Sequence, residues 1–211
     1  KFMFKISSRR IKDTPFSEYL KKAGVKDYTV YNRVLLATVF DTLEKDYIHL
    51  NSHVQIWDVT CQKQIQISGI NSLEMIQKIT PRDLTNLSLN KCYYLPIVNK
   101  YGKMLNDPIL YQLDKNTFRL SISDNDITNI FHGISAVSDL DVYVNELEIY
   151  TIAIQGPKSE ELISSVFNNK VSGLRSFELL KLFYDEEKII ISKTGFSSYG
   201  GYEIYISNKN L

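Results

Sequence analysis

Two carboxylates stand in apolar or aromatic surroundings, where an acid could serve chemistry inside a cavity. Asp107 follows the strand-like stretch Lys103–Asn106 and precedes Pro108. It is either a turn residue that faces solvent or a functional acid that points into a cavity, and the pattern leaves both readings open. Glu203 lies between Tyr202 and Ile204 in an aromatic strand. Glu203 either faces solvent or is a buried carboxylate that binds a ligand rich in hydrogen-bond donors. The alternation of side chains along the strand slightly favours the solvent-facing interpretation.

Other motifs indicate chemistry less strongly. His49 and His53 have the i, i+4 spacing of metal ligands, but no Glu accompanies them as in a zinc protease helix, so we interpret them as surface histidines. The segment Gly195–Gly201 is rich in glycine but lacks the spacing of phosphate-binding loops. No Gly-x-Ser-x-Gly elbow is present, and a Ser/His/Asp triad is therefore not predicted.

Composition narrows the classes of protein. The 211 residues are 44% hydrophobic and 23% charged, with a formal net charge of +1, which is typical of a folded protein without a nucleic-acid or anionic-membrane partner. No apolar run approaches the length of a membrane span, so we expect a cytoplasmic protein. The two cysteines, Cys61 and Cys92, are far apart and are expected to be free thiols.

The elements that must position these residues mix strands and helices without regular βαβ alternation, which predicts an α+β fold. Helices are expected at 41–47, from Asn71 onward, after an Asp124 cap and after Gly156-Pro157. Strands are expected at 54–59, 65–68, 92–98, 109–113, 118–122, 141–144, 149–154, 179–184, 189–192 and 202–206.

Ordered sequence blocks carry a family resemblance. They are Asp58–Val59 with Gln64–Ile65 and Gly69, Thr80–Leu84, Gly102–Asp107, Ile154–Lys158, and Thr194–Phe196 with Gly201–Ile204. Together they resemble the folate-binding aminomethyltransferase family, whose members include the glycine-cleavage T-protein. The resemblance implies the T-protein fold of mixed sheets with packed helices. It also implies that residues 1–211 are one folate-binding domain without an internal boundary, the N-terminal part of a longer architecture whose C-terminal domain is missing.

Within the family, the stretches Val54–Val59, Cys92–Tyr94 and Leu105–Pro108 resemble the branch that demethylates dimethylsulfoniopropionate. The resemblance implies an enzyme that transfers a methyl group from this small sulfonium substrate to N5 of tetrahydrofolate, leaving methylmercaptopropionate. A glycine-cleavage-type aminomethyltransferase and a non-catalytic folate-binding relative or fragment are the alternatives, and a homodimer stays open. The methyl donor is left open by departures from the branch at Arg33, Val34, Ala37, Gln62, Lys63 and Phe196.

The resemblance also suggests roles for individual residues. It implies that Glu203 accepts hydrogen bonds from the pterin edge, and that Tyr94, Ser123 and Tyr205 contact folate. Asp107 is the expected catalytic residue and acts on the folate side, because a carboxylate against the sulfonium would stabilise the ground state more than the transition state. Tyr31 and Trp57 are expected to hold the sulfonium by cation–π contact, although each could instead belong to the core. No metal is expected.

Overall fold

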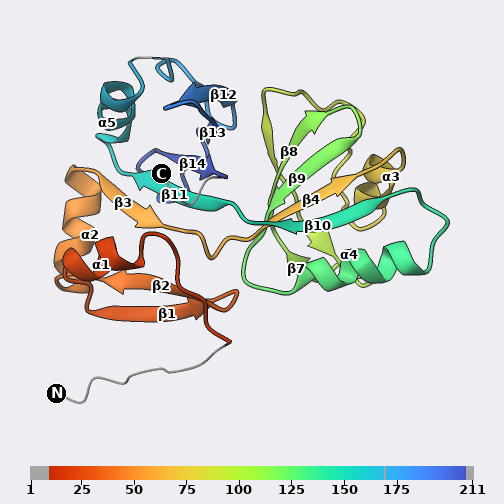
Figure 1. Ribbon diagram of the computed structural model, residues 1–211, viewed down its shortest axis with the longest axis horizontal. Coiled ribbons are helices and arrows are strands. Elements are labelled where there is room, and N and C mark those ends of the chain that lie inside the picture. Colours follow the sequence, from red (N-terminus) through yellow and green to blue (C-terminus); the bar gives the residue numbers. More distant parts are fainter. Residues whose placement is uncertain (1–9, 169, 208–211) are drawn as a thin grey trace.

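The computed structural model describes residues 10–168 and 170–207, and the chain end at Leu211, after which we expected a further domain, lies outside them. Within this part, two five-stranded antiparallel sheets carry most of the fold (Figure 1). The first sheet has the order β10 (Tyr143–Leu147), β4 (Gln64–Ser68), β9 (Thr117–Ser121), β8 (Ile109–Asp114), β5 (Cys92–Tyr94). The second has the order β12 (Leu179–Tyr184), β13 (Glu187–Ser192), β14 (Gly201–Ile206), β11 (Tyr150–Gln155), β3 (Gln55–Asp58).

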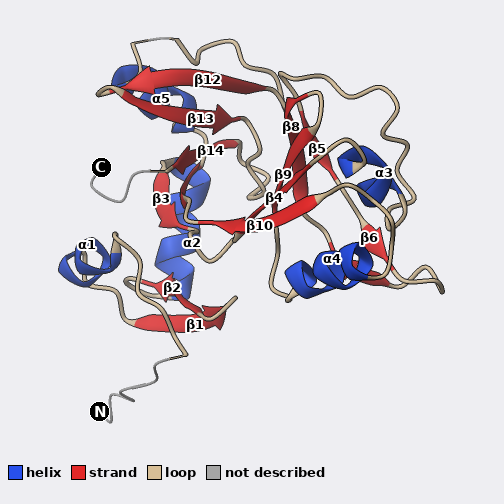
Figure 2. Cartoon of the chain, turned by 45° about the vertical axis from the view of Figure 1, so that its right-hand side comes forward, coloured by secondary structure: helices blue, strands red, loops and turns tan. Residues whose placement is uncertain are grey.

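Helices lie on the outer sides of the two sheets (Figure 2). On the first sheet, α3 (Ser72–Gln77) and α4 (Ile127–Ala136) cover a core that includes Ile65, Phe118 and Phe131. On the second sheet, α5 (Ser159–Val166) packs its Ile163 into a cluster with Tyr202 and Ile204. Apolar residues repeated at helical spacing thus bury one face of each helix against a sheet.

The inner faces of the two sheets meet in a third cluster. It joins Cys92 and Tyr111 of the first sheet to Ile190 and Tyr205 of the second. Because side chains alternate along a strand, β14 sends Tyr202 and Ile204 toward α5 and sends Glu203 and Tyr205 toward the first sheet. The central strand β14 is therefore buried on both faces.

The N-terminal elements form a smaller layer beside β3 (Figure 1). They are α1 (Ser17–Lys22), the hairpin of β1 (Asp27–Tyr31) and β2 (Val34–Val39), and α2 (Leu43–Ser52). The hairpin turns at Asn32 and Arg33, both with positive φ (48° and 65°). The Asn32 amide bonds to the carbonyls of Cys61 and Ser123, which fixes this turn against the first sheet.

The predicted α+β class is confirmed, and several boundaries are corrected. The strand expected at 92–98 is two strands, β5 and β6 (Ile97–Val98), because Pro96 interrupts it, and β6 pairs with β7 (Met104–Asn106). Helix α4 begins after Asp126, while Asp124 instead accepts a hydrogen bond from the Asn32 backbone. The hairpin of β1 and β2 was not predicted. No described helix has the length and apolar character needed to cross a membrane.

Candidate functional site

A cavity of about 1010 Å³ lies where the two sheets and the N-terminal layer meet. The N-terminal layer contributes Tyr31 and His49, and β3 contributes Trp57. The first sheet contributes Tyr94, Ile109 and Ser121. Asp107, Ser123, Phe177 and Phe196 reach the cavity from loops, and Glu203 reaches it from β14.

Glu203 is a buried carboxylate, and its side chain is only 2% exposed. The Thr194 hydroxyl and the Tyr205 hydroxyl both donate to its Oε2, the latter at 3.0 Å. Thr194 is held in turn by the Ser192 hydroxyl, 2.6 Å away. The second oxygen, Oε1, accepts no hydrogen bond from the described residues. Burial raises the pKa of Glu203, and the two hydroxyl donors only partly oppose this.

No Lys or Arg in the described part of the chain lies within ion-pair distance of Glu203. A buried carboxylate normally has its charge matched by a cation or by several donors. The solvent-facing interpretation of Glu203 is therefore wrong, because β14 lies in the middle of a sheet covered on both faces. The arrangement suits a ligand that brings N–H donors to Oε1.

Asp107 follows β7 and is half-buried at the cavity wall. The Ser123 hydroxyl donates to its Oδ1, and the Tyr94 hydroxyl donates to its Oδ2 at 3.4 Å. The neighbouring Asn106 fixes Ser123, because its side-chain oxygen accepts the Ser123 N–H and its amide donates to the Ser123 carbonyl, both at 3.1 Å. Asp107 is therefore oriented by hydroxyl groups while it stays open to the cavity.

Tyr94 is 40% exposed and forms one side of the Asp107 site. Partial burial and the charge of Asp107 both raise the pKa of Tyr94, so the phenol keeps its proton and donates to the carboxylate. Tyr94 therefore lies at the cavity surface and not in the core.

Aromatic rings line another part of the cavity. Trp57 and Phe196 have ring centroids 5.4 Å apart and tilted by 57°. The Trp57 indole N–H donates to Gln55 at 2.9 Å, and the Gln55 amide donates to the Asp46 carbonyl, which fixes the tryptophan. Tyr31, at the end of β1, also lines the cavity. Aromatic faces of this kind can hold a cation without an anionic partner.

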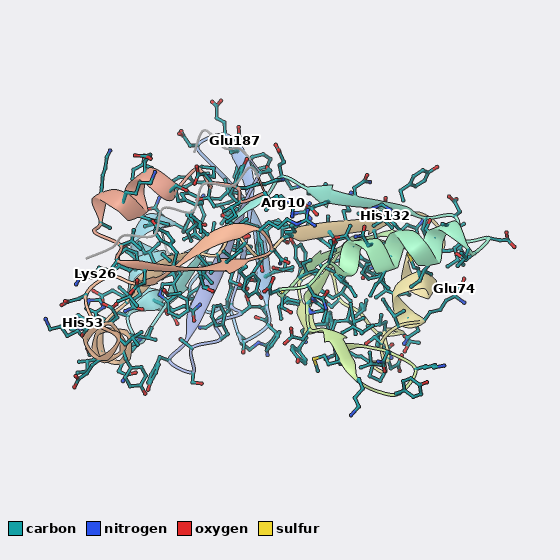
Figure 3. All side chains as sticks on the ribbon, turned by 90° about the horizontal axis from the view of Figure 1, so that it is seen from below. Arg10, Lys26, His53, Glu74, His132 and Glu187 are labelled. Carbon is teal, nitrogen blue, oxygen red and sulfur yellow. The ribbon has the colours of Figure 1, made fainter. Side chains whose placement is uncertain are left out.

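The remaining sequence motifs have surface or packing positions, although His49 also lines the cavity. His49 and His53 are exposed and stack on each other at 4.9 Å, and Figure 3 shows His53 on α2 far from His132 on α4. Among the described residues no group of His, Cys, Asp and Glu could hold a metal ion. The glycines of Gly195–Gly201 serve close packing, since a Cβ on Gly195 would lie 2.6 Å from the Gly201 nitrogen. Cys61 and Cys92 are free and buried.

The structure brings six of the seven predicted site residues to one cavity: Tyr31, Trp57, Tyr94, Asp107, Ser123 and Glu203. Tyr205 has a different place. It is 2% exposed and does not line the cavity, and its hydroxyl donates to Oε2 of Glu203. Its position indicates that it orients Glu203, and direct contact with a ligand is not supported.

Sequence reasoning missed two aromatic contacts. Phe196 was noted only as a departure from the resembling branch, yet it packs on Trp57 inside the cavity. Phe177 lines the cavity from the segment that leads into β12 and has a positive φ of 61°. An aromatic residue inside a glycine-rich loop was the available signal for Phe196, whereas nothing local marks Phe177.

Comparisons with known proteins show which family the sequence resembles. The family model of the GCVT N-terminal domain matches residues 16–211. The chain is 40% identical over 97% of its length to a dimethylsulfoniopropionate demethylase, DmdA, of Ruegeria pomeroyi, and covers 56% of that protein. It is 26% identical over 92% of its length to an aminomethyltransferase of Bacillus subtilis, and covers 54% of it.

A solved structure is similar in fold. The glycine cleavage system aminomethyltransferase T from Bartonella henselae superposes with a TM-score of 0.80 at 21% identity, over 93% of this chain and 54% of that one. The chain spans about half the length of the curated relatives it matches. From the extent of the family match and this shared fold, the chain belongs to the GCVT N-terminal domain family.

Proposed function

We propose that this chain is the folate-binding part of a tetrahydrofolate-dependent methyltransferase that demethylates dimethylsulfoniopropionate. The observation that carries the proposal is Glu203, a buried carboxylate in the cavity wall whose Oε1 has no partner among the described residues. The 40% identity to a dimethylsulfoniopropionate demethylase supports the choice of methyl donor.

The donor set of the cavity fits a folate. The edge of a pterin presents an amino group beside a ring N–H, and a carboxylate is the acceptor that matches two such donors. Because Thr194 and Tyr205 both donate to Oε2, Oε1 keeps both of its lone pairs for the two donors of this edge. Thr194 and Tyr205 thus hold Glu203 ready before a ligand arrives. When bound, tetrahydrofolate supplies a nucleophilic nitrogen, N5, that accepts the one-carbon group.

Asp107 suits a role beside the nucleophile. A thioether leaves a sulfonium as a neutral group, so the chemistry needs alignment more than a general acid. Positive charge on sulfur disappears in the transition state, and a carboxylate at the sulfur would slow the reaction. Asp107, oriented by Ser123 and Tyr94, therefore acts on the nitrogen side through a hydrogen bond or a bound water.

The aromatic part of the cavity suits the sulfonium. Tyr31, Trp57 and Phe196 offer ring faces, and the ring of Trp57 is fixed by Gln55. Asp46 also lines the cavity, but its carboxylate accepts the backbone N–H groups of Phe40 and Asp41. The rings thus hold the sulfonium, while the hydrogen bonds of the Asp46 carboxylate are directed to the backbone.

The test is to incubate the 211-residue chain with tetrahydrofolate and dimethylsulfoniopropionate. Binding of tetrahydrofolate is followed by calorimetry, and 5-methyltetrahydrofolate is followed by chromatography. Methyl transfer supports the proposal. Turnover only with an aminomethyl donor would assign the chain to the aminomethyltransferase reaction. Folate binding without either turnover would make it a folate-binding relative or fragment that does not catalyse on its own. Absence of folate binding would overturn the proposal.

A further inference from the structure

The two stacked histidines at the end of α2 have different positions relative to the cavity. His49 lines the cavity, whereas His53, which follows the last residue of α2, does not. Both side chains are exposed to solvent. A residue that is exposed and also lines a cavity lies at its mouth, so His49 meets a ligand at the point where the ligand enters.

The end of α2 is held against the turn between β11 and α5. The Lys158 N–H donates to the His53 carbonyl at 3.2 Å, and a Cβ on Gly156 would clash with the same oxygen. The His53 ring is held by the Ser52 hydroxyl, which lies 2.8 Å from its Nδ1. The His49 ring stacks on the His53 ring with centroids 4.9 Å apart and planes inclined by 16°. Backbone and ring contacts therefore fix the place where the His49 imidazole meets the cavity.

His49 lies beside the aromatic part of the cavity. Asp46 precedes it by three residues, which places both side chains on one side of α2, and both line the cavity. The Asp46 carbonyl accepts the Gln55 amide at 2.7 Å, and the Gln55 oxygen accepts the indole N–H of Trp57 at 2.9 Å. His49 is therefore one helical turn from the group that orients Trp57.

His49 is the side chain in the described cavity wall that can carry a positive charge. Three carboxylates line the cavity, those of Asp46, Asp107 and Glu203. None of the described lining residues is Lys or Arg, and the other donors are hydroxyl, amide, thiol and indole groups, which are neutral. An imidazole donates from one nitrogen when neutral and from both when protonated. An anionic group that enters the cavity therefore finds its best partner in this wall at His49.

The substrate of the proposed function is a zwitterion. In dimethylsulfoniopropionate a short aliphatic link joins the sulfonium to a carboxylate, so both charges enter the same part of the cavity. The ring faces of Tyr31, Trp57 and Phe196 attract the cation, but a ring face is negative and does not attract the carboxylate. A carboxylate that leaves water without a donor costs free energy, and the nearby acids would add to this cost.

We propose that His49 binds the carboxylate of the substrate, so that the chain selects sulfonium compounds that carry a carboxylate over simple sulfonium cations. This inference rests on the proposed function. The rings then hold one end of the substrate and the imidazole holds the other. Two contacts of opposite character fix the direction in which the sulfonium lies in the cavity.

The test titrates two probes into the 211-residue chain by calorimetry, without tetrahydrofolate so that no methyl transfer occurs. The probes are dimethylsulfoniopropionate and dimethylpropylsulfonium, in which a methyl group replaces the carboxylate. His49→Phe keeps a ring for stacking but has no N–H, and should weaken binding of dimethylsulfoniopropionate about three- to tenfold. Its affinity for dimethylpropylsulfonium should be nearly unchanged. His49→Gln, which keeps a neutral N–H donor, should lose less affinity for the zwitterion than His49→Phe.

His53→Phe is the matched control, because His53 shares the stack but does not line the cavity. It should bind both probes as the unmodified chain does. In the methyl-transfer assay, His49→Phe should raise KM for dimethylsulfoniopropionate by the same factor as the dissociation constant and leave kcat within about twofold. The substrate carboxylate does not change during methyl transfer, so its contact contributes equally to the ground state and the transition state.

The outcomes separate this inference from the proposed function. If neither probe binds, the proposed methyl donor is wrong and the inference fails with it. If dimethylsulfoniopropionate binds equally well to the unmodified chain and to His49→Phe, the proposed function stands and the inference alone is overturned. An equal loss of affinity for both probes would also overturn it, because the effect would not depend on the carboxylate. The same loss in His53→Phe would overturn it too, and would show that the stacked pair supports α2.

Discussion

Glu203 and Asp107 line the same cavity but have opposite surroundings. Glu203 lies in a central strand, is 2% exposed and has one oxygen held by two hydroxyl donors. Asp107 follows a short strand, is half-buried and has a hydroxyl partner on each oxygen. Glu203 thus keeps one oxygen without a donor from the described residues, whereas both oxygens of Asp107 have a hydroxyl donor.

This difference in surroundings predicts different roles for Glu203 and Asp107. Removing the Glu203 carboxylate from water costs free energy that its two hydroxyl donors offset in part, and the N–H donors of a ligand can offset more of it. Asp107 is less dependent on a ligand, because a hydroxyl group donates to each of its oxygens. Glu203 is therefore expected to act mainly on ligand affinity, and Asp107 mainly on turnover.

The largest expected effect is on folate binding by Glu203→Gln. The variant removes a charge-assisted acceptor worth roughly 1.5–3 kcal/mol, so the tetrahydrofolate dissociation constant should rise about 10- to 150-fold. Titration calorimetry measures the dissociation constant, and Glu161→Gln, at an exposed position of α5, is the matched control. An unchanged dissociation constant would show that Oε1 does not contact the ligand.

Asp107→Asn should lower turnover and leave folate affinity nearly unchanged, the opposite of the expectation for Glu203→Gln. The variant is nearly isosteric and keeps an acceptor for Ser123 or Tyr94, so the fold and folate affinity should change little. Turnover with dimethylsulfoniopropionate should fall about tenfold, the value of one charge-assisted hydrogen bond in the transition state. Single-turnover kinetics with saturating folate checks this, and Asp139→Asn, on an exposed loop, is the control. Full activity would return Asp107 to the role of a turn residue.

The sequence predicted strands well where the residues of a single segment show an apolar run or an alternation of apolar and polar side chains. The range 179–184 matches β12, and the alternating residues of 54–59 contain β3. The same alternation gave the wrong prediction for Glu203, because it assumes that one face of the strand is exposed to water. In β14 the residues Gly201–Tyr205 are all buried, since helix α5 covers one face and the first sheet covers the other.

The hairpin of β1 and β2 was missed for a different reason. Its turn is Asn32-Arg33, whereas two-residue hairpin turns with positive φ usually contain glycine. The long-range bonds of Asn32 to Cys61, Ser123 and Asp124 stabilise this turn, and no local pattern reveals them. Likewise, the Asp107–Ser123 pair depends on the antiparallel pairing of β8 with β9, which brings the two residues that flank this hairpin together.

A smaller effect should follow from Thr194→Val, which removes one of the two donors to Glu203 Oε2. Loss of this donor should raise the pKa of Glu203 further and weaken tetrahydrofolate binding about threefold at neutral pH. The binding should also become more pH-dependent, with affinity lost at a higher pH than in the unmodified chain. Calorimetry across pH 5 to 8 measures this, and Thr85→Val at an exposed turn should have no such effect. An unchanged pH profile would contradict a role for Thr194 in setting the ionisation of Glu203.

The smallest expected effect is on the stability of the ligand-free chain, and it follows from the burial of Glu203. Burial raises the pKa of Glu203, so in the folded chain Glu203 binds its proton more tightly than in the unfolded chain. Stability therefore falls as pH rises from the ordinary glutamate pKa through the raised one. Glu203→Gln removes this loss, and its melting temperature should exceed that of the unmodified chain at pH 7. The excess should vanish below about pH 4, where both states of the unmodified chain are protonated. A Glu203→Gln variant that is less stable than the unmodified chain at pH 7 would mean that the two hydroxyl donors outweigh the cost of burial.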